Sequence, residues 1–185
     1  DVILSGKSGG INAAVYTTGV NLANALTVAA GNLTIQGATL VGGIATPLPG
    51  SSATGSRYGF SSGAAGDITV SGNISLAGTS VTFLGGYLLG DVLSTDGNVA
   101  LTGAGLYAMS LSAPVTAGTG ANPRTLTITT TGSNGYGLTT AAAAALSATG
   151  SIALTAYSTI GASGISIAAP IRSTLRGDVV ISSYA

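Results

Sequence analysis

A five-residue pattern returns along the chain at nearly constant intervals, and it limits the folds that the chain can adopt. From residue 72 to residue 177 the copies start 25, 27, 26 and 27 residues apart. They are Gly72-Asn73-Ile74-Ser75-Leu76, Gly97-Asn98-Val99-Ala100-Leu101, Arg124-Thr125-Leu126-Thr127-Ile128, Gly150-Ser151-Ile152-Ala153-Leu154 and Gly177-Asp178-Val179-Val180-Ile181. A fixed period of about 20–50 residues is the signature of a repeat architecture.

The N-terminal third carries looser copies of the same pattern. They read Asp1-Val2-Ile3-Leu4, Gly31-Asn32-Leu33-Thr34-Ile35 and Gly66-Asp67-Ile68-Thr69-Val70. The last two start 35 residues apart. We expect the extra length to be a surface loop inserted into one repeat at about residues 47–63, which are rich in Pro, Gly and Ser.

Each copy alternates between two kinds of side chain. The third and fifth residues are large aliphatics, whereas the second and fourth are mostly Asn, Asp, Ser, Thr or Ala. Strand side chains point to opposite faces in turn, so this period of two predicts a short strand with one face in a core. Shorter groups of apolar residues follow in each unit, so we expect two or three short strands per unit.

A unit of this size cannot bury its aliphatic face alone, so successive units must stack equivalent strands. The connections are too short for crossover helices, which makes the stacking parallel and the path a coil. The sequence predicts an all-β fold, a parallel β-solenoid with coils of about 26 residues spanning residues 1–185 as one domain, with about seven rungs roughly 4.8 Å apart. The interior columns are Ile74, Val99, Leu126, Ile152 and Val179, and beside them Leu76, Leu101, Ile128, Leu154 and Ile181.

Three other folds use parts of this pattern. Residues Thr139 to Ala148 include five consecutive Ala and have the propensity for a short helix. A transmembrane β-barrel also alternates, but its strands need about 9–11 residues and aromatic girdles. A β-sandwich also consists of strands and turns, but it does not predict the repeated interval.

Charge is scarce in this chain. Five Lys and Arg balance five acidic residues, all of them Asp, and His, Cys and Trp are absent. We therefore expect no nucleic-acid partner, no thiolate chemistry and no zinc, iron–sulfur or copper cofactor. The apolar runs are shorter than the roughly 18 residues of a membrane helix, so we do not expect a membrane-embedded chain. An apolar content of 45% predicts a folded rather than a disordered chain.

The acidic residues do not predict catalysis. Glycoside cleavage needs two carboxyl groups roughly 5–9.5 Å apart, and the only pair close in sequence is Asp91 and Asp96. Both stand next to Gly, where Asp is typical of a turn. Asp67 and Asp178 occupy the same position of the pattern, which favours a structural role at a strand entrance. We expect no enzyme; a polysaccharide lyase or hydrolase is the alternative.

Several segments resemble a known family. They are Gly31-Asn32-Leu33-Thr34-Ile35, the stretch from Leu146 to Ala156, and Gly161-Ala162-Ser163-Gly164-Ile165-Ser166-Ile167. These segments resemble the repeat regions of filamentous-haemagglutinin-type exoproteins, the bacterial surface adhesins exported by two-partner secretion. The resemblance is compositional and covers most of residues 64–185. It implies a right-handed parallel β-helix and a secreted or cell-surface location.

The two ends of the chain carry near copies of one segment. Asp1-Val2-Ile3-Leu4-Ser5 and Asp178-Val179-Val180-Ile181-Ser182 stand at the same phase of the coil, and neither has a recognisable cap. We interpret the chain as a processed product or an excised segment of a longer solenoid. We expect its ends to associate with further coils through Val2, Ile3 and Leu4 at one end and Val179, Val180 and Ile181 at the other.

These observations predict a non-enzymatic extracellular rod of a bacterial surface fibre that associates end to end. An adhesin shaft is the alternative, with Tyr157, Tyr184 and Arg172 as candidate contacts for surface glycans. The Thr125, Thr127 and Thr129 row raises ice binding as a further alternative, although the neighbouring rows mix Ala, Asn and Ser with Thr.

Overall fold

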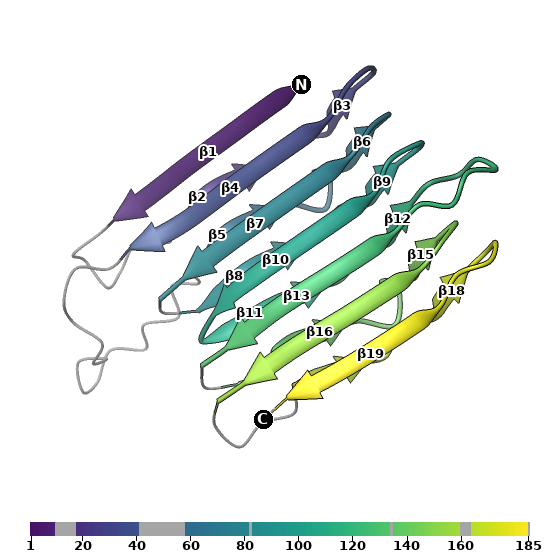
Figure 1. The fold of residues 1–185 in the computed structure, drawn as a ribbon. Helices are drawn as coiled ribbons and strands as arrows, with labels where there is room; N and C mark the ends of the chain where they lie inside the picture. Colours follow the sequence, from purple (N-terminus) through teal and green to yellow (C-terminus); the bar gives the residue numbers. More distant parts are fainter. Residues whose placement is uncertain (10–17, 41–57, 82, 134, 160–163, 185) are drawn as a thin grey trace.

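A computed structural model describes residues 1–9, 18–40, 58–81, 83–133, 135–159 and 164–184 of the chain (Figure 1). Its strands form three parallel sheets that wind into a β-solenoid of about six turns, with about 27 residues per coil. The predicted all-β solenoid is therefore confirmed. Each complete coil contributes one strand to each sheet, in chain order.

Sheet 1 is the longest and faces the viewer in Figure 1. Its strands are β1 (Val2–Gly9), β4 (Leu33–Leu40), β7 (Ile74–Ser80), β10 (Val99–Gly105), β13 (Leu126–Gly132), β16 (Ile152–Ser158) and β19 (Val179–Tyr184). Sheet 2 holds β2 (Thr18–Leu22), β5 (Tyr58–Ser62), β8 (Leu84–Leu88), β11 (Tyr107–Leu111), β14 (Leu138–Thr140) and β17 (Ile165–Ile167). Sheet 3 holds β3 (Leu26–Val28), β6 (Ile68–Val70), β9 (Val92–Ser94), β12 (Val115–Ala117), β15 (Leu146–Ala148) and β18 (Ile171–Ser173).

The two expected aliphatic columns lie in register on sheet 1. Each residue pairs with its counterpart in the next coil, from Ile74 with Val99 to Leu154 with Ile181. The column members on β7, β10, β13 and β16 are at most 2% exposed. Val179 and Ile181 occupy the same columns but are 45% and 49% exposed, because no further coil covers β19 in the described chain. The prediction that they are interior residues is therefore wrong for the chain taken alone.

The copy at residue 66 lies in a different sheet from the other copies. Leu33 pairs with Ile74, so β4 and β7 are the successive strands of sheet 1, and the asparagines that precede them are 41 positions apart. Ile68 pairs with Leu26 in sheet 3 instead. Alternating Ile-Thr-Val suits any half-buried strand, so the pattern does not say to which sheet it belongs. Asp67 and Asp178 are therefore not equivalent, since they precede strands of different sheets.

Two other expectations concern local segments. Residues 47–57 of the expected loop lie outside the described residues, whereas residues 58–62 are not loop, because they form β5. The alternative of a helix at Thr139 to Ala148 is wrong: this stretch holds the end of β14, a turn in which the Ala144 N–H bonds the Ala141 carbonyl, and β15. Burial of Leu138 and Leu146 in the solenoid outweighs the propensity of the Ala run.

Sheets 1 and 2 touch along a line of paired glycines. A Cβ atom on Gly78 would overlap the carbonyl oxygen of Gly85, and one on Gly37 would overlap that of Gly59. The same column of sheet 1 runs through Gly6, Gly37, Gly78, Gly103, Thr130 and Ala156. Where this column holds Thr130 and Ala156, the side chains of both lie against Gly137, next to β14 of sheet 2. Glycine is needed here because two backbones approach too closely for side chains on both.

Buried hydroxyl groups satisfy the backbone where the chain turns between sheets. Ser62 Oγ accepts the N–H groups of Leu89 and Gly90 from the next coil, at 3.2 and 3.1 Å. Thr140 Oγ1 accepts those of Ala168 and Ala169 in the same way. A buried backbone N–H without a partner is costly, so these side chains let narrow turns stay dry.

Candidate functional site

The acidic residues serve as turn and ladder groups. Asp91 precedes β9, and its N–H donates a 2.9 Å hydrogen bond to Asp67 Oδ1 of the preceding coil. Asp96 follows β9 and forms an ion pair of 2.6 Å with Arg124 of the following coil. The Arg124 guanidinium lowers the pKa of Asp96 through its hydrogen bond and its charge, and Asn122 adds a further hydrogen bond. A group that is held ionised and tied to arginine is poorly suited to donate a proton.

Within the described ranges there is no group of three His, Cys, Asp or Glu side chains that could hold a metal ion. Among those same residues, no helix has the length and apolar character that crossing a bilayer requires.

A ladder of polar side chains crosses the entrances of the sheet 1 strands. Asp1 Oδ1 accepts the N–H of Asn32, whose own Oδ1 accepts the N–H of Asn73. The ladder continues from Asn73 to Asn98 and from Asn98 to Thr125 at 2.9 and 2.8 Å, and Ser151 Oγ accepts the N–H of Asp178. Every step runs the same way: a side chain accepts from the backbone of the following coil. In the sequence, the sign of this ladder is the hydrogen-bonding residue, Asn, Thr, Ser or Asp, at the second position of the repeat. The alternation of apolar and polar residues predicts only that this side chain faces outward.

The two ends of the solenoid present open strand edges in the described chain. Val99 N–H bonds the Thr125 carbonyl and Ile152 N–H bonds the Asp178 carbonyl, so the first residue of these strands donates toward the following coil. Val179 is the equivalent residue of β19, so its N–H points away from β16. At the other end, β1, β2 and β3 are the first strands of the three sheets. The residues expected to associate, Val2, Ile3 and Leu4 with Val179, Val180 and Ile181, therefore lie on opposite end coils.

Most outward side chains of sheet 1 are small and neutral. The register places its outward residues in three columns across the strands. These columns are Ile3, Thr34, Ser75, Ala100, Thr127, Ala153 and Val180; then Ser5, Gln36, Ala77, Thr102, Thr129, Thr155 and Ser182; then Lys7, Ala38, Thr79, Ala104, Thr131, Tyr157 and Tyr184. Thr127 and Thr129 belong to this face, whereas Thr125 bonds Asn98 at the strand entrance. Lys7 is the one charged residue of the three columns.

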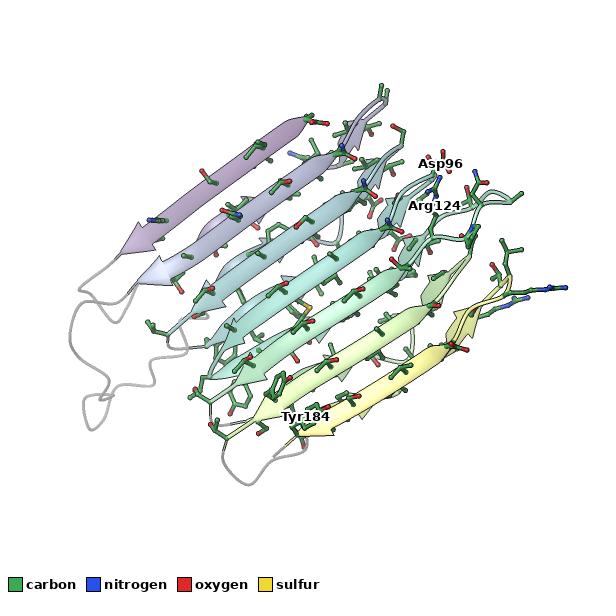
Figure 2. All side chains as sticks on the ribbon, in the orientation of Figure 1. Asp96, Arg124 and Tyr184 are labelled. Carbon is green, nitrogen blue, oxygen red and sulfur yellow. The ribbon has the colours of Figure 1, made fainter. Side chains whose placement is uncertain are left out.

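The candidate glycan contacts do not converge. Tyr157 and Tyr184 stack with ring centroids 4.9 Å apart and planes 14° apart, and they are 43% and 52% exposed. Arg172 lies on β18 of sheet 3, beside Ser147 of the preceding coil. Figure 2 shows Tyr184 at the opposite end of the strands from Asp96 and Arg124. Arg172 is therefore not part of the tyrosine stack.

Two further features were not predicted from the sequence. Tyr58 stacks on Tyr87 at 5.1 Å and meets Phe83 edge to face at 5.9 Å, and Phe83 meets Tyr107 in turn, so aromatic side chains from three coils cluster at the start of sheet 2. A shallow hollow of about 360 Å³ lies on sheet 1, lined by Ser5, Gly6, Lys7, Gln36, Gly37, Ala38, Ala77 and Thr79. The hollow falls on the first three strands of sheet 1, at the far end of that face from Tyr157 and Tyr184.

Comparison of the chain with protein-family models, with curated proteins and with solved structures finds no match.

Proposed function

We propose that this chain is a non-enzymatic structural rod of an extracellular bacterial fibre of the filamentous-haemagglutinin type, and that its end coils pair with further β-coils. The observation that carries the proposal is the pair of open ends. All three sheets reach both ends of the described chain, and no further described strand pairs with their terminal strands. An unpaired strand edge is a template for another strand, so a solenoid with open ends tends to continue.

The two ends match in register. Continuing sheet 1 by one strand brings Val2 beside Val179 and Leu4 beside Ile181, which extends both aliphatic columns. Sheets 2 and 3 continue in the same way, from β17 to β2 and from β18 to β3. Exposed aliphatic area of this kind stabilises association by about 25 cal/mol for each Å² that it buries.

The polar ladder has the direction that such stacking needs. Its last described member, Asp178, stands where Asn98 and Asn73 accept a backbone N–H from the following coil. A carboxylate accepts hydrogen bonds only, so it suits that position when a coil follows. A coil from a second copy, or from further residues of a longer polypeptide, would supply the donor.

Electron microscopy and light scattering of the purified 185-residue chain test this proposal. We expect concentration-dependent filaments with a meridional repeat of about 4.8 Å. Val179→Pro removes the N–H that points toward the next coil and should shorten or abolish them. Val179→Ala keeps this N–H and should weaken assembly much less. Monomers at every concentration, or equal filaments from Val179→Pro, would contradict end-to-end pairing.

Glycan binding by an adhesin shaft is the second candidate function. The exposed Tyr157–Tyr184 stack favours it, because aromatic faces offer apolar area with polar hydroxyl groups beside it. A glycan array probed with the chain and with Tyr184→Ser tests this function. Tyr136→Ser is the matched control, because Tyr136 is 44% exposed, close to the 52% of Tyr184, and lies outside the stack. Binding that survives Tyr184→Ser would exclude the stack as the glycan site.

A further inference from the structure

We propose that two copies of this rod pair face to face through the outer face of sheet 1, with their solenoid axes antiparallel. The two-fold axis lies between the faces, runs parallel to the strands and passes over β10. The first strand of one copy then faces the last strand of the other, and each column of outward residues faces itself. This pairing is lateral, so it goes beyond end-to-end association.

The chemistry of the face permits close approach of a second copy. Between β7 and β13 its outward residues are Ser75, Ala77, Thr79, Ala100, Thr102, Ala104, Thr127, Thr129 and Thr131. None of these residues is charged, and none is larger than Thr. Figure 1 shows the strands side by side in one broad, open layer. A flat layer of small neutral side chains can pack on its own copy without burying a charge.

The larger residues of the face sit where the symmetry pairs them. The first column has aliphatic residues larger than Ala only at its two ends, Ile3 and Val180, which are 74% and 54% exposed. The two-fold axis places Ile3 of one copy against Val180 of the other, and the reverse. An isologous interface requires this kind of self-complementarity.

The third column pairs large residues with the hollow. The same axis places Tyr157 over Ala38 and Tyr184 over Lys7 of the second copy, which are two of the residues that line the hollow of about 360 Å³. A lysine ammonium that contacts a tyrosine ring gains a cation–π interaction. The two Lys7 side chains lie at opposite ends of the interface, so they do not repel each other.

The contact area is sufficient for a stable dimer. Seven strands about 4.8 Å apart, each presenting about seven residues at roughly 3.3 Å per residue, give a face of about 600 Å² per copy. The two copies together bury about 1,200 Å², which reaches the range of stable interfaces. End-to-end stacking leaves this area open, because Ile3, Val180 and both tyrosine rings still point outward in a longer rod.

Sedimentation velocity on a Val179→Pro background isolates lateral pairing, because that substitution blocks the end of the rod. We expect a species of twice the chain mass of 17.5 kDa. Thr102→Arg sets two arginines against each other on the two-fold axis and should return the mass to that of one chain. Ser110→Arg lies on β11 of the same coil, on the outer side of sheet 2, and should leave the dimer intact. A monomer without Thr102→Arg, a dimer that survives it, or a dimer lost equally with Ser110→Arg overturns the proposal.

A disulfide gives a second readout. The chain has no Cys, so Thr102→Cys introduces a single thiol, which faces its symmetry mate across the axis. We expect covalent dimers on mild oxidation of Thr102→Cys, and at least tenfold fewer with Ser110→Cys. Equal yields from the two variants would count against the two-fold arrangement.

The two proposals fail separately. Filaments that persist in Thr102→Arg, with no dimer in Val179→Pro, would leave end-to-end association standing and remove lateral pairing. Dimers that depend on Thr102, in a chain that forms no filament, would do the reverse. Lys7 and Tyr184 are unsuitable as probes, because end stacking brings them together as well.

Discussion

At the residue scale, the paired glycines are the most constrained positions of the fold. An added methyl group at Gly78 would meet the backbone of Gly85, and neither sheet can shift without disturbing its neighbours in the stack. We expect Gly78→Ala to destabilise the fold by about 3 kcal/mol, the upper range of overpacking costs. Gly120→Ala is the control, since a Cβ there meets nothing within 4 Å, and it should change stability by less than about 1 kcal/mol. Equal urea midpoints for the two variants would contradict the close contact of the sheets.

The buried surroundings of Thr130 determine how its side chain affects the stability of the fold. Its side chain is fully buried in the glycine column, and its Oγ1 has no hydrogen-bond partner in the described part of the chain. Thr130→Val keeps the shape of the side chain and removes a buried hydroxyl group that has no hydrogen-bond partner among the described residues to replace water. We expect urea unfolding to show a gain of about 1 kcal/mol. Thr140→Val, which removes an acceptor of two backbone N–H groups, should instead be destabilising.

At the scale of elements, the Asp96–Arg124 pair links the turn after β9 to the loop before β13, and it makes this link sensitive to acid. The pKa of Asp96 is lowered from its ordinary value of 3.8, so the pair stabilises the fold above that pH and is lost as the pH falls through the lowered pKa. We expect Asp96→Asn to lower the melting temperature slightly at pH 7 and to match the unchanged protein well below pH 3.8. Arg124→Gln should remove the same pH-dependent contribution to the melting temperature, because it also breaks the ion pair. If the difference in melting temperature between Asp96→Asn and the unchanged protein stays constant down to pH 2, the ion pair is not its cause.

The strands of sheet 1 are the elements that a single sequence predicts best. From β7 to β19 their aliphatic residues recur at short, regular intervals, and alternation marks the side that faces the core. Alternation does not distinguish Ile68 from the residues of sheet 1, because its three-residue strand in sheet 3 alternates in the same way. The glycine pairs went unpredicted, since their partners lie on different sheets and only the coil's cross-section brings them together. The hollow and the aromatic cluster were also missed, because both depend on how neighbouring coils align.

At the scale of the whole molecule, each coil contacts only its neighbours, so stability should fall from the middle of the rod toward its ends. The interior residues of β10 and β13 are covered on both sides, whereas Val179 and Ile181 are about half exposed. In hydrogen exchange of the doubly substituted Val179→Pro, Thr102→Arg chain, which we expect to be monomeric, the slowest amides should lie in β10 and β13 and the fastest in β1 and β19. In assembled filaments of the unchanged chain, β1 and β19 should become as protected as the centre. End coils already as protected as β10 in the monomer would mean that they gain no stability from a further coil, which would contradict an extendable rod.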